Sequence, residues 1–353
     1  MTIRVAINGF GRIGRMVYRR AIEQGDIDVV AVNGTSDAAT LAHLLKYDSV
    51  HGTWSVPVDV TEGGFKAGKQ ETKLFMTRDP SVLPWAELGI DVVVEATGKF
   101  RTRETAGIHL QQGAKRVVIT APAKTDNDAD MTMVIGVNHT EFDADHHQIV
   151  SGASCTTNCL APVVKVLHET FGIESGLVTT VHSYTNDQNN LDNPHQDLRR
   201  ARSCGQSVIP TKTGAAKAIG LVLPELAGKL NGISLRIPTP NVSIIDLVVQ
   251  VKAPVTREEI NQALSRAAAV DMPSILGYTE EPLVSIDFNG DSRSAIVDGL
   301  STMVVNESTV KVLAWYDNEW GYSCRIVDII REIALATRTG STHPAAATAY
   351  HPQ

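Results

Sequence analysis

The opening of the chain constrains the fold most strongly, because it sets a glycine-rich turn between an apolar strand and a helix. Residues 3–7 form a short apolar run, and residues 12–24 carry apolar side chains at helical spacing. Gly9, Gly11 and Gly14 fit G-x-G-x-x-G, the pattern that brings a pyrophosphate close to the backbone at a helix N-terminus. The alternative is a tight strand-to-helix turn without a ligand. The context of strand, turn and helix favours a dinucleotide-binding opening.

Strands and helices continue to alternate over the first 150 residues. The pattern predicts further elements at 28–32 (strand), 38–47 (helix), 54–77 (a β-ribbon), 91–95, 116–119 and 133–135 (strands). Such alternation predicts a parallel sheet with helices on its faces. We therefore expect residues 1–152 to form a Rossmann-type, doubly wound α/β domain.

The pattern changes after residue 153. Longer strands are expected at 243–252 and 310–316, and residues 183–207 are polar without hydrophobic periodicity. We expect an α+β catalytic domain over 153–318, with a mixed or largely antiparallel sheet and helices on one face. An amphipathic helix at 319–337 should rejoin the first domain. The remaining residues, 338–353, are expected to be a disordered tail.

Composition narrows the class of protein. A length of 353 residues suits two domains, and a net charge of −7 argues against a dedicated nucleic-acid or anionic-membrane binder. Neither a secretory signal nor a membrane span is visible. The four cysteines do not suggest a disulfide framework, and Cys155 and Cys159 would sit too far apart on one helix for an unstrained bridge. We expect a cytoplasmic protein.

Cys155 is the strongest candidate for chemistry. It stands between the strand-like residues 148–153 and a helical pattern, so its thiol lies where a helix begins. A helix N-terminus or a nearby imidazolium lowers a thiol pKa, and a thiolate attacks carbonyl carbon. His182, in the polar turn after residues 177–181, is the candidate base. An isolated histidine is more often structural, and its pairing with Cys155 is what favours catalysis.

The end of the second strand bears on cofactor choice. Dinucleotide sites that prefer NAD place a carboxylate there, on the ribose 2′-hydroxyl. This chain has Asn33, Gly34, Thr35 and Ser36 instead, so repulsion of a 2′-phosphate is absent and two hydroxyls are available to it. The sequence thus predicts NADP in preference to NAD, or use of both. The alternative is that Asp37 reaches the ribose.

Six motifs in order along nearly the whole chain resemble the phosphorylating glyceraldehyde-3-phosphate dehydrogenase family. They are residues 7–15 (INGFGRIGR), 153–159 (ASCTTNC), 182–185 (HSYT), 197–202 (DLRRAR), 235–243 (LRIPTPNVS) and 315–323 (WYDNEWGYS). Gly34 resembles the NADP-using bacterial branch, which works in the reductive, gluconeogenic direction. Pro194 is retained where some NADP-using relatives have a small hydroxyl residue, so the NADP prediction depends mainly on Gly34.

The resemblance implies oxidation of a phosphorylated aldehyde with inorganic phosphate, through a thiohemiacetal and a thioester on Cys155. His182 would pair with the thiolate and then take the hemiacetal proton. The substrate phosphate would meet Thr185 and Arg236, and the attacking phosphate would meet Ser154, Thr156, Arg200, Thr213 and Gly214. The implied cofactor contacts are Arg12 and Ile13 at the pyrophosphate, Arg78 near the adenine, Thr97 and Thr120 along the ribose path, and Asn318 at the nicotinamide. A homotetramer is the family expectation.

Other functions remain open at this point. Erythrose-4-phosphate dehydrogenase would share Cys155 and His182 but lack the phosphate-attack step. A thiol hydrolase or a non-catalytic nucleotide-sensing protein are further alternatives, which the dinucleotide pattern and the full catalytic set disfavour. His146 and His147 beside Asp143 and Asp145 mimic a metal cluster, yet adjacent residues rarely converge on one ion, so we expect a solvated loop and no metal. Arg199 and Arg202 are interpreted as scaffold or interface.

Overall fold

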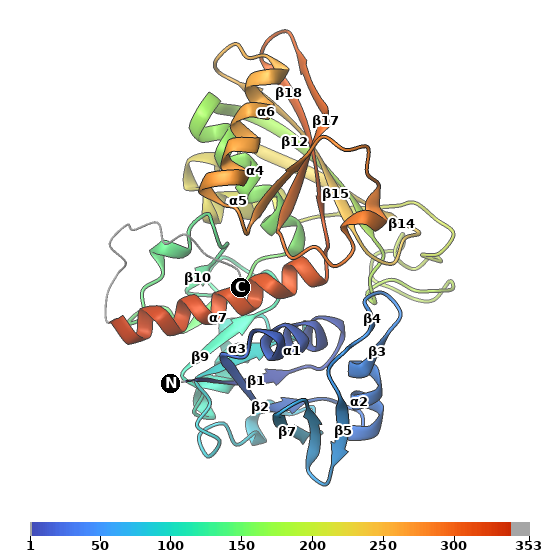
Figure 1. The fold of residues 1–353 in the computed structure, drawn as a ribbon, viewed down its shortest axis with the longest axis vertical. Coiled ribbons are helices and arrows are strands. Elements are labelled where there is room, and N and C mark those ends of the chain that lie inside the picture. Colours follow the sequence, from blue (N-terminus) through green and yellow to red (C-terminus); the bar gives the residue numbers. More distant parts are fainter. Residues whose placement is uncertain (1, 340–353) are drawn as a thin grey trace. The chain divides into compact units, whose positions relative to one another are not determined.

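The computed structural model describes residues 2–339, which form two compact units (Figure 1). The N-terminal unit contains residues 2–133, 139–153 and 323–339, and the C-terminal unit contains residues 134–138 and 154–322. Helix α7 (Trp320–Thr339) includes residues 338 and 339 of the tail expected to be disordered, and from residue 340 onward that tail lies outside the described residues.

Within the described residues, the N-terminal unit is built on a nine-stranded sheet. In spatial order its strands are β10 (Met131–Thr132), β11 (Ile149–Ser151), β9 (Arg116–Ile119), β8 (Val92–Glu95), β1 (Ile3–Asn8), β2 (Ile27–Asn33), β7 (Gln70–Phe75), β6 (Gly64–Ala67) and β5 (Val58–Thr61). The strands from β10 to β7 are parallel, whereas β5 and β6 add an antiparallel ribbon at one edge. The chain runs outward from β1 in both directions, and this reversal is the switch point at which open α/β sheets bind ligands.

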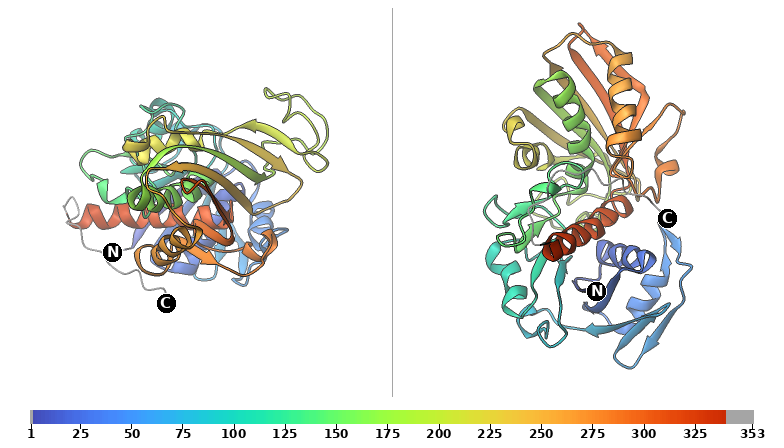
Figure 2. Two further views of the ribbon diagram at one scale, coloured as in Figure 1. Left: turned by 90° about the horizontal axis from the view of Figure 1, so that it is seen from above. Right: turned by 60° about the vertical axis from the view of Figure 1, so that its left-hand side comes forward.

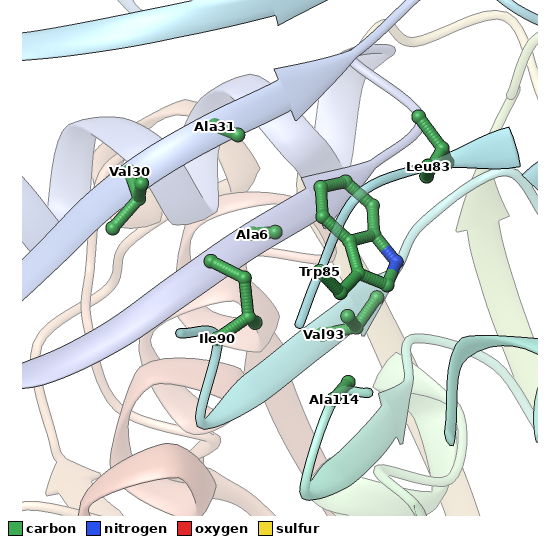
Figure 3. Close-up of a cluster of buried hydrophobic side chains, with 8 residues drawn as sticks. All are labelled: Ala6, Val30, Ala31, Leu83, Trp85, Ile90, Val93 and Ala114. Atoms are coloured by element: carbon green, nitrogen blue, oxygen red, sulfur yellow. The ribbon is translucent and has the colours of Figure 1, made fainter. Parts of the chain in front are cut away.

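The helices of this unit follow their strands as an α/β fold requires. They are α1 (Arg12–Gln24), α2 (Ala38–Lys46), α3 (Arg103–Gln111) and, from residue 323, the end of α7 (Trp320–Thr339). On one face of the sheet, Trp85 packs with Ala6, Val30 and Val93 in a buried apolar cluster (Figure 3). The small hairpin β3 (Tyr47–Asp48) and β4 (Gly52–Thr53) follows α2.

The C-terminal unit contains a seven-stranded mixed sheet in its described part. The strands, in spatial order, are β13 (Ile209–Lys212), β14 (Leu230–Ile237), β12 (Ile173–Ser183), β15 (Ser243–Val251), β18 (Thr309–Tyr316), β17 (Ala295–Val305) and β16 (Leu276–Thr279). Two pairs, β12–β14 and β16–β17, are parallel and the others are antiparallel. The predicted fold class, a doubly wound sheet plus an α+β unit, is confirmed.

Three helices cover one face of this sheet: α4 (Cys155–Phe171), α5 (Ala215–Val222) and α6 (Arg257–Arg266) (Figure 1; Figure 2, left). Strand residues facing the helices are buried, as in β15, where every second side chain from Ser243 to Val251 is inaccessible. On the opposite face, apolar side chains remain exposed, including Leu177, Ile233 and Met303.

Several boundaries differ from those expected. The strand expected at 133–135 is replaced by β10 at Met131–Thr132, and α6 is followed by a π-turn at Ala267–Asp271. Short 3₁₀ turns lie at Pro80–Val82, His139–Glu141, Pro224–Leu226 and Ser285–Phe288. None of the helices in residues 2–339 is both long enough and apolar enough to cross a bilayer.

Candidate active site

Cys155 is the first residue of α4, and local capping defines that helix start. Ser154 is the N-cap in extended conformation, and its hydroxyl accepts the N–H of Thr157 at 3.0 Å. Ala153 before it has φ +54°, a left-handed conformation that is strained for alanine. The backbone therefore turns sharply into α4, so the sulfur lies at the positive end of the helix.

His182, near the end of β12, is brought to this sulfur. Its Nε2 lies 3.4 Å from Cys155 Sγ, and the histidine is 4% exposed. Nδ1 lies 2.7 Å from the carbonyl oxygen of Ser183, which can only accept. Nδ1 also lies 2.8 Å from Nη1 of Arg236, which can only donate, so these two contacts do not fix the tautomer. A proton on Nδ1 leaves the lone pair of Nε2 directed at the thiol.

Arg236 stands beside this pair because β14 runs parallel to β12 with His182 opposite Arg236. Its Nη1 lies 3.0 Å from the Ser183 carbonyl and 2.8 Å from Nδ1 of His182. Nη1 can only donate: it donates to the carbonyl if Nδ1 carries the proton, and it can donate to Nδ1 if that nitrogen carries none. Nε of Arg236 is buried and has no hydrogen-bond partner in the described part of the chain. A buried donor left in this state suits an anionic ligand.

Burial and charge act in opposite directions on the catalytic pair. Burial raises the pKa of the Cys155 thiol, whereas the charge of Arg236 and hydrogen bonds involving Thr156 lower it. Burial, followed by the charge of Arg236, lowers the pKa of His182 to about 3. Burial thus opposes both members of the thiolate–imidazolium pair expected from the sequence, whereas the charge of Arg236 favours the thiolate and opposes the imidazolium. The ion pair stays a prediction.

The hydroxyl of Thr156 does not extend freely from the start of α4. Its Oγ1 lies 2.9 Å from the phenol oxygen of Tyr316, which is 2.8 Å from Oγ1 of Thr180. The Tyr316 ring also meets the ring of His182 edge to face, with centroids 5.9 Å apart. Sequence spacing gave no signal for this contact, because Tyr316 is 160 residues from Thr156.

Arg200 is held by acidic neighbours. Its guanidinium pairs with Asp187, and its Nε donates to Thr211 Oγ1 at 3.0 Å. No hydrogen bond within residues 2–339 joins it to Thr156, with which the family resemblance groups it. The positive charge of Arg200 nevertheless contributes to lowering the pKa of His182, after burial and the charge of Arg236. Arg200 therefore acts on His182 electrostatically.

The remaining anion-site candidates lie on turns. Thr185 belongs to the turn after β12, where Gln188 N–H donates to its carbonyl at 2.9 Å. Thr213 and Gly214 precede α5, and Gly214 is an N-cap without a side-chain cap. The hydroxyl of Thr213 instead accepts the N–H of Ala215, the first amide of α5, at 3.2 Å. Asn318 is fixed by Ser243, whose hydroxyl donates to Asn318 Oδ1 at 2.8 Å.

In the N-terminal unit, the glycine-rich turn has the geometry that a dinucleotide needs. Gly9 has φ +99°, and a Cβ there would lie 2.6 Å from the backbone of Thr97. A Cβ on Gly14 would lie 2.1 Å from Gly9 O, whereas one on Gly11 would meet nothing within 4 Å. The backbone at Gly11 is therefore open to a ligand, and α1 begins there without a side-chain cap or an acidic residue in its first turn.

Several cofactor candidates already have protein partners. Arg12 forms a two-pronged ion pair with the buried carboxylate of Asp48, at 2.7 and 3.1 Å. Thr97 and Thr120 both bond to Glu95: the amide of Thr97 to the carboxylate at 2.8 Å, and the amide of Thr120 to the carbonyl at 3.0 Å. Ile13 is half-buried on α1, and Arg78 is exposed on the turn after β7.

The end of β2 bears directly on the 2′-position. Gly34 is buried, Thr35 is exposed and Ser36 is half-buried. Both carboxylate oxygens of Asp37 are engaged with Thr40, at 2.9 Å to its amide and 2.9 Å to its hydroxyl, as the N-cap of α2. Asp37 is therefore committed to capping, which weakens the alternative in which it binds the ribose.

The histidine-rich loop has a simple arrangement. His146 is 79% exposed in its side chain and lies 2.9 Å from Asp143. No group of three or more potential metal ligands occurs among residues 2–339.

Comparison with known proteins agrees with this organisation. Residues 154–318 match the family model described as the C-terminal domain of glyceraldehyde 3-phosphate dehydrogenase, and residues 3–103 match its NAD binding domain. The chain is 58% identical to glyceraldehyde-3-phosphate dehydrogenase 2 of Bacillus subtilis, over 98% of this chain and 100% of that protein. It is 57% identical to the Geobacillus stearothermophilus enzyme and 55% to that of Borreliella burgdorferi, covering 95% and 94% of this chain and 99% of each relative.

Proposed function

Because the chain belongs to the glyceraldehyde-3-phosphate dehydrogenase family and is an NAD(P)-dependent oxidoreductase, we propose how its own residues perform the reaction. The substrate is D-glyceraldehyde 3-phosphate, which is oxidised reversibly with inorganic phosphate to 1,3-bisphosphoglycerate. The observation that carries this proposal is Cys155 at the start of α4 with Nε2 of His182 at 3.4 Å.

The first steps use the thiol and the imidazole. Cys155 Sγ forms a bond to the aldehyde carbon, and the sulfur proton passes through Nε2 of His182 to the carbonyl oxygen, so the imidazole is neutral again. The product is a thiohemiacetal. His182 then removes the hemiacetal hydroxyl proton while the hydride departs, which leaves a thioester on Cys155. The bound nicotinamide supplies the acceptor for that hydride.

Phosphate completes the cycle by attacking the thioester carbon, so that the carbon–sulfur bond breaks and the thiolate leaves. Two anion sites are required, one for the substrate phosphate and one for the attacking phosphate. Arg236, with a buried Nε awaiting an acceptor, supports one of them. The N-terminus of α5 after Gly214, where the Thr213 hydroxyl accepts the N–H of Ala215, supports the other.

The cofactor proposed is NADP, with NAD as a second possibility. The glycine turn fits a dinucleotide, and the residues after β2 favour the 2′-phosphate. Gly34 brings no charge, Thr35 offers an exposed hydroxyl, and Asp37 is occupied in capping α2. We assign the chain to the reductive, gluconeogenic direction, in which the acyl phosphate acylates Cys155 and the aldehyde is released.

We also propose a homotetramer in the cytoplasm. The helix-free face of the seven-stranded sheet exposes apolar side chains, with Leu177 66% and Ile233 50% exposed, and such a face suits burial against further copies of this chain. All four cysteines are free thiols, as a reducing compartment would keep them. Light scattering would give the mass, and a stable monomer would contradict the assembly.

Steady-state rates with NAD and with NADP, each with and without phosphate, test the function. The proposal predicts that turnover of glyceraldehyde 3-phosphate requires phosphate and that kcat/KM is higher with NADP. Equal turnover without phosphate would contradict the phosphorylating reaction, and a large advantage for NAD would contradict the cofactor assignment.

A further inference from the structure

A row of buried polar side chains crosses the carboxyl ends of β2, β1 and β8, at the switch point of the nine-stranded sheet. Asn33, Asn8 and Glu95 are the last residues of these strands, and strand pairing sets Asn8 beside both of the others. Their exposed fractions are 5%, 1% and 1%. Burying three such groups is costly unless each is hydrogen-bonded, so their partners matter.

Trp85 fixes the direction of the hydrogen bonds at one end of the row. Its indole Nε1 can only donate, and it lies 3.1 Å from Nδ1 of His109, so Nδ1 accepts. The neutral imidazole therefore carries its proton on Nε2, which donates to Oε2 of Glu95 at 3.1 Å. A protonated imidazole would set two donors face to face at Trp85.

Glu95 receives donors from both sides. Asn8 Nδ2 donates to Oε2 at 2.6 Å, and the amide of Thr97 donates to Oε1 at 2.8 Å. The Thr97 hydroxyl also contacts Oε1. An ionised carboxylate accepts all of these bonds, because it has no proton of its own. Within the described residues its ion-pair partner is His109, and that ring is neutral, so hydrogen bonds rather than a cation stabilise the charge.

At the other end the row reaches the turn after β7. Asn33 Nδ2 donates to Asn8 Oδ1 at 2.7 Å and to the carbonyl of Thr77 at 3.0 Å, and Asn33 Oδ1 accepts the amide of Thr77 at 3.1 Å. The carbonyl of Asn33 also accepts the amide of Gly9 at 2.9 Å. The glycine turn and the loops that carry Arg78 and Thr97 are thus joined at the carboxyl ends of the strands, where open α/β sheets bind ligands.

We propose that Glu95 is a positioning residue for the dinucleotide. Through Thr97 on one side and through Asn8 and Asn33 on the other, it fixes three loops at the carboxyl ends of the strands, and His109, held neutral by Trp85, completes its donor set. This inference rests on the proposed function, since it takes these loops to hold NADP or NAD. It also sets the polarity of Thr97: its hydroxyl proton is directed to Glu95, so Thr97 meets the cofactor as an acceptor, suited to a ribose hydroxyl.

Exchanging the carboxylate and the amide tests the arrangement. Glu95→Gln turns an amide NH₂ toward the donors of Asn8 and His109, or toward the amide of Thr97 if it flips. Asn8→Asp places a second carboxylate against that of Glu95, where the parent has a 2.6 Å hydrogen bond, so that the two negative charges repel each other. The double variant Asn8→Asp/Glu95→Gln restores the pairing with the roles exchanged. Nε2 of His109 lies 3.4 Å from the side-chain nitrogen of Asn8, within reach of a carboxylate oxygen at that position.

Affinity for NADP and NAD, measured by calorimetry on the full chain, is the readout. Each single variant should raise Kd at least about tenfold, equivalent to about 1.4 kcal/mol, and the double variant should return it to within about threefold of the parent. Glu23→Gln is the matched control, because Glu23 accepts from Trp54 Nε1 at 2.9 Å in the same unit and should leave Kd unchanged. If Glu23→Gln raised Kd as much as Glu95→Gln does, the proposal would be overturned.

Two other outcomes would also overturn it: Glu95→Gln binding as tightly as the parent, or a double variant weaker than both singles, as independent structural damage would give. A parent protein that binds neither cofactor would instead remove the proposed function. If the variants do not fold, ¹⁵N NMR of histidine-labelled parent protein still decides. We expect a neutral His109 ring protonated at Nε2, and an imidazolium or an Nδ1-protonated ring at neutral pH would overturn the arrangement.

Discussion

Nε2 of His182 lies 3.4 Å from Sγ of Cys155, while Nδ1 of the same ring is held at 2.7 Å from the Ser183 carbonyl. In the tautomer with the proton on Nδ1, which the proposed mechanism uses, the ring directs one N–H at the backbone and one lone pair at the thiol. The base is therefore oriented before substrate arrives, and little reorganisation is needed when the proton moves.

Replacing the nucleophile should stop turnover. Cys155→Ser should lower kcat by at least about a thousandfold, because a hydroxyl at this position is a far weaker nucleophile than a thiol. Cofactor binding, measured by calorimetry, should persist. Cys159→Ala is the control: Cys159 is fully buried in α4, with Sγ 3.8 Å from the Ala314 carbonyl, and should retain turnover. Near-normal oxidation by Cys155→Ser would contradict the covalent mechanism.

Removing the base should slow the same reaction less severely. His182→Gln should reduce kcat by roughly 10²–10⁴, the usual contribution of a positioned acid–base group. Alkylation of Cys155 by iodoacetamide should also slow at neutral pH, since the thiol loses its acceptor. His168→Gln, in the last turn of the same helix as Cys155, serves as a control. Unchanged alkylation in His182→Gln would show that the imidazole does not act on the sulfur.

Cofactor choice should respond to one added carboxylate. Gly34→Asp should shift the kcat/KM ratio from NADP toward NAD by roughly tenfold to a thousandfold, because like charges about 4 Å apart repel by about 1–4 kcal/mol. A Cβ at Gly34 would lie 2.9 Å from Leu41 Cδ1, so Gly34→Ala measures the steric part alone. The same ratio in both variants would mean that charge at this position does not select the cofactor.

The hydroxyl of Tyr316 should contribute to stability as well as to the site. Tyr316→Phe leaves the buried hydroxyls of Thr156 and Thr180 without their shared partner, at a cost of about 1–3 kcal/mol in unfolding free energy. Tyr47→Phe, at a side chain that is 51% exposed, should have no such effect. Urea unfolding followed by circular dichroism measures both. Equal midpoints for the two variants would contradict the bridging role.

The Arg12–Asp48 pair should make stability depend on acid pH. Burial opposes ionisation of Asp48, but hydrogen bonds from Arg12 and from the His51 and Val50 amides lower its pKa from 3.8 to about 2. The stabilisation is thus present above pH 3.8 and is lost as pH falls through about 2. The difference in melting temperature between the parent and Asp48→Asn should therefore shrink over this range. A difference in melting temperature that stays constant over this pH range would contradict a stabilising role for the Arg12–Asp48 pair.

The sequence predicted the elements whose apolar periodicity is strong and local. Strand β1, helix α1 and the start of α4 at Cys155 follow directly from such patterns. The expected strands omitted β17, because Asp298, Gly299 and Ser301 interrupt its apolar run. Helix α3 was also omitted: it has few apolar residues, and its stability comes from the Thr102 cap and from burial of Ala106 and His109.

The site was predicted as a set of residue types but not as a set of contacts. Cys155 and His182 stand in distinctive motifs, and the fold brings them together. Tyr316 stands in one of the recognised motifs, but nothing local indicated its contact with Thr156. Asp48 and Asp187 had no local signal either, because tertiary folding brings them to Arg12 and Arg200 within their own units. Glu95 appeared in the sequence only as the end of a buried strand, and its role emerges from its neighbours in space.

A single-turnover experiment without phosphate tests the central claim most directly. Mixing the enzyme with oxidised cofactor and glyceraldehyde 3-phosphate should give a rapid burst of up to one reduced cofactor per Cys155, followed by near arrest as the thioester accumulates. Adding phosphate should restart turnover and release the acyl phosphate. Absence of a burst, or continuous turnover at the same rate before and after phosphate is added, would contradict the mechanism.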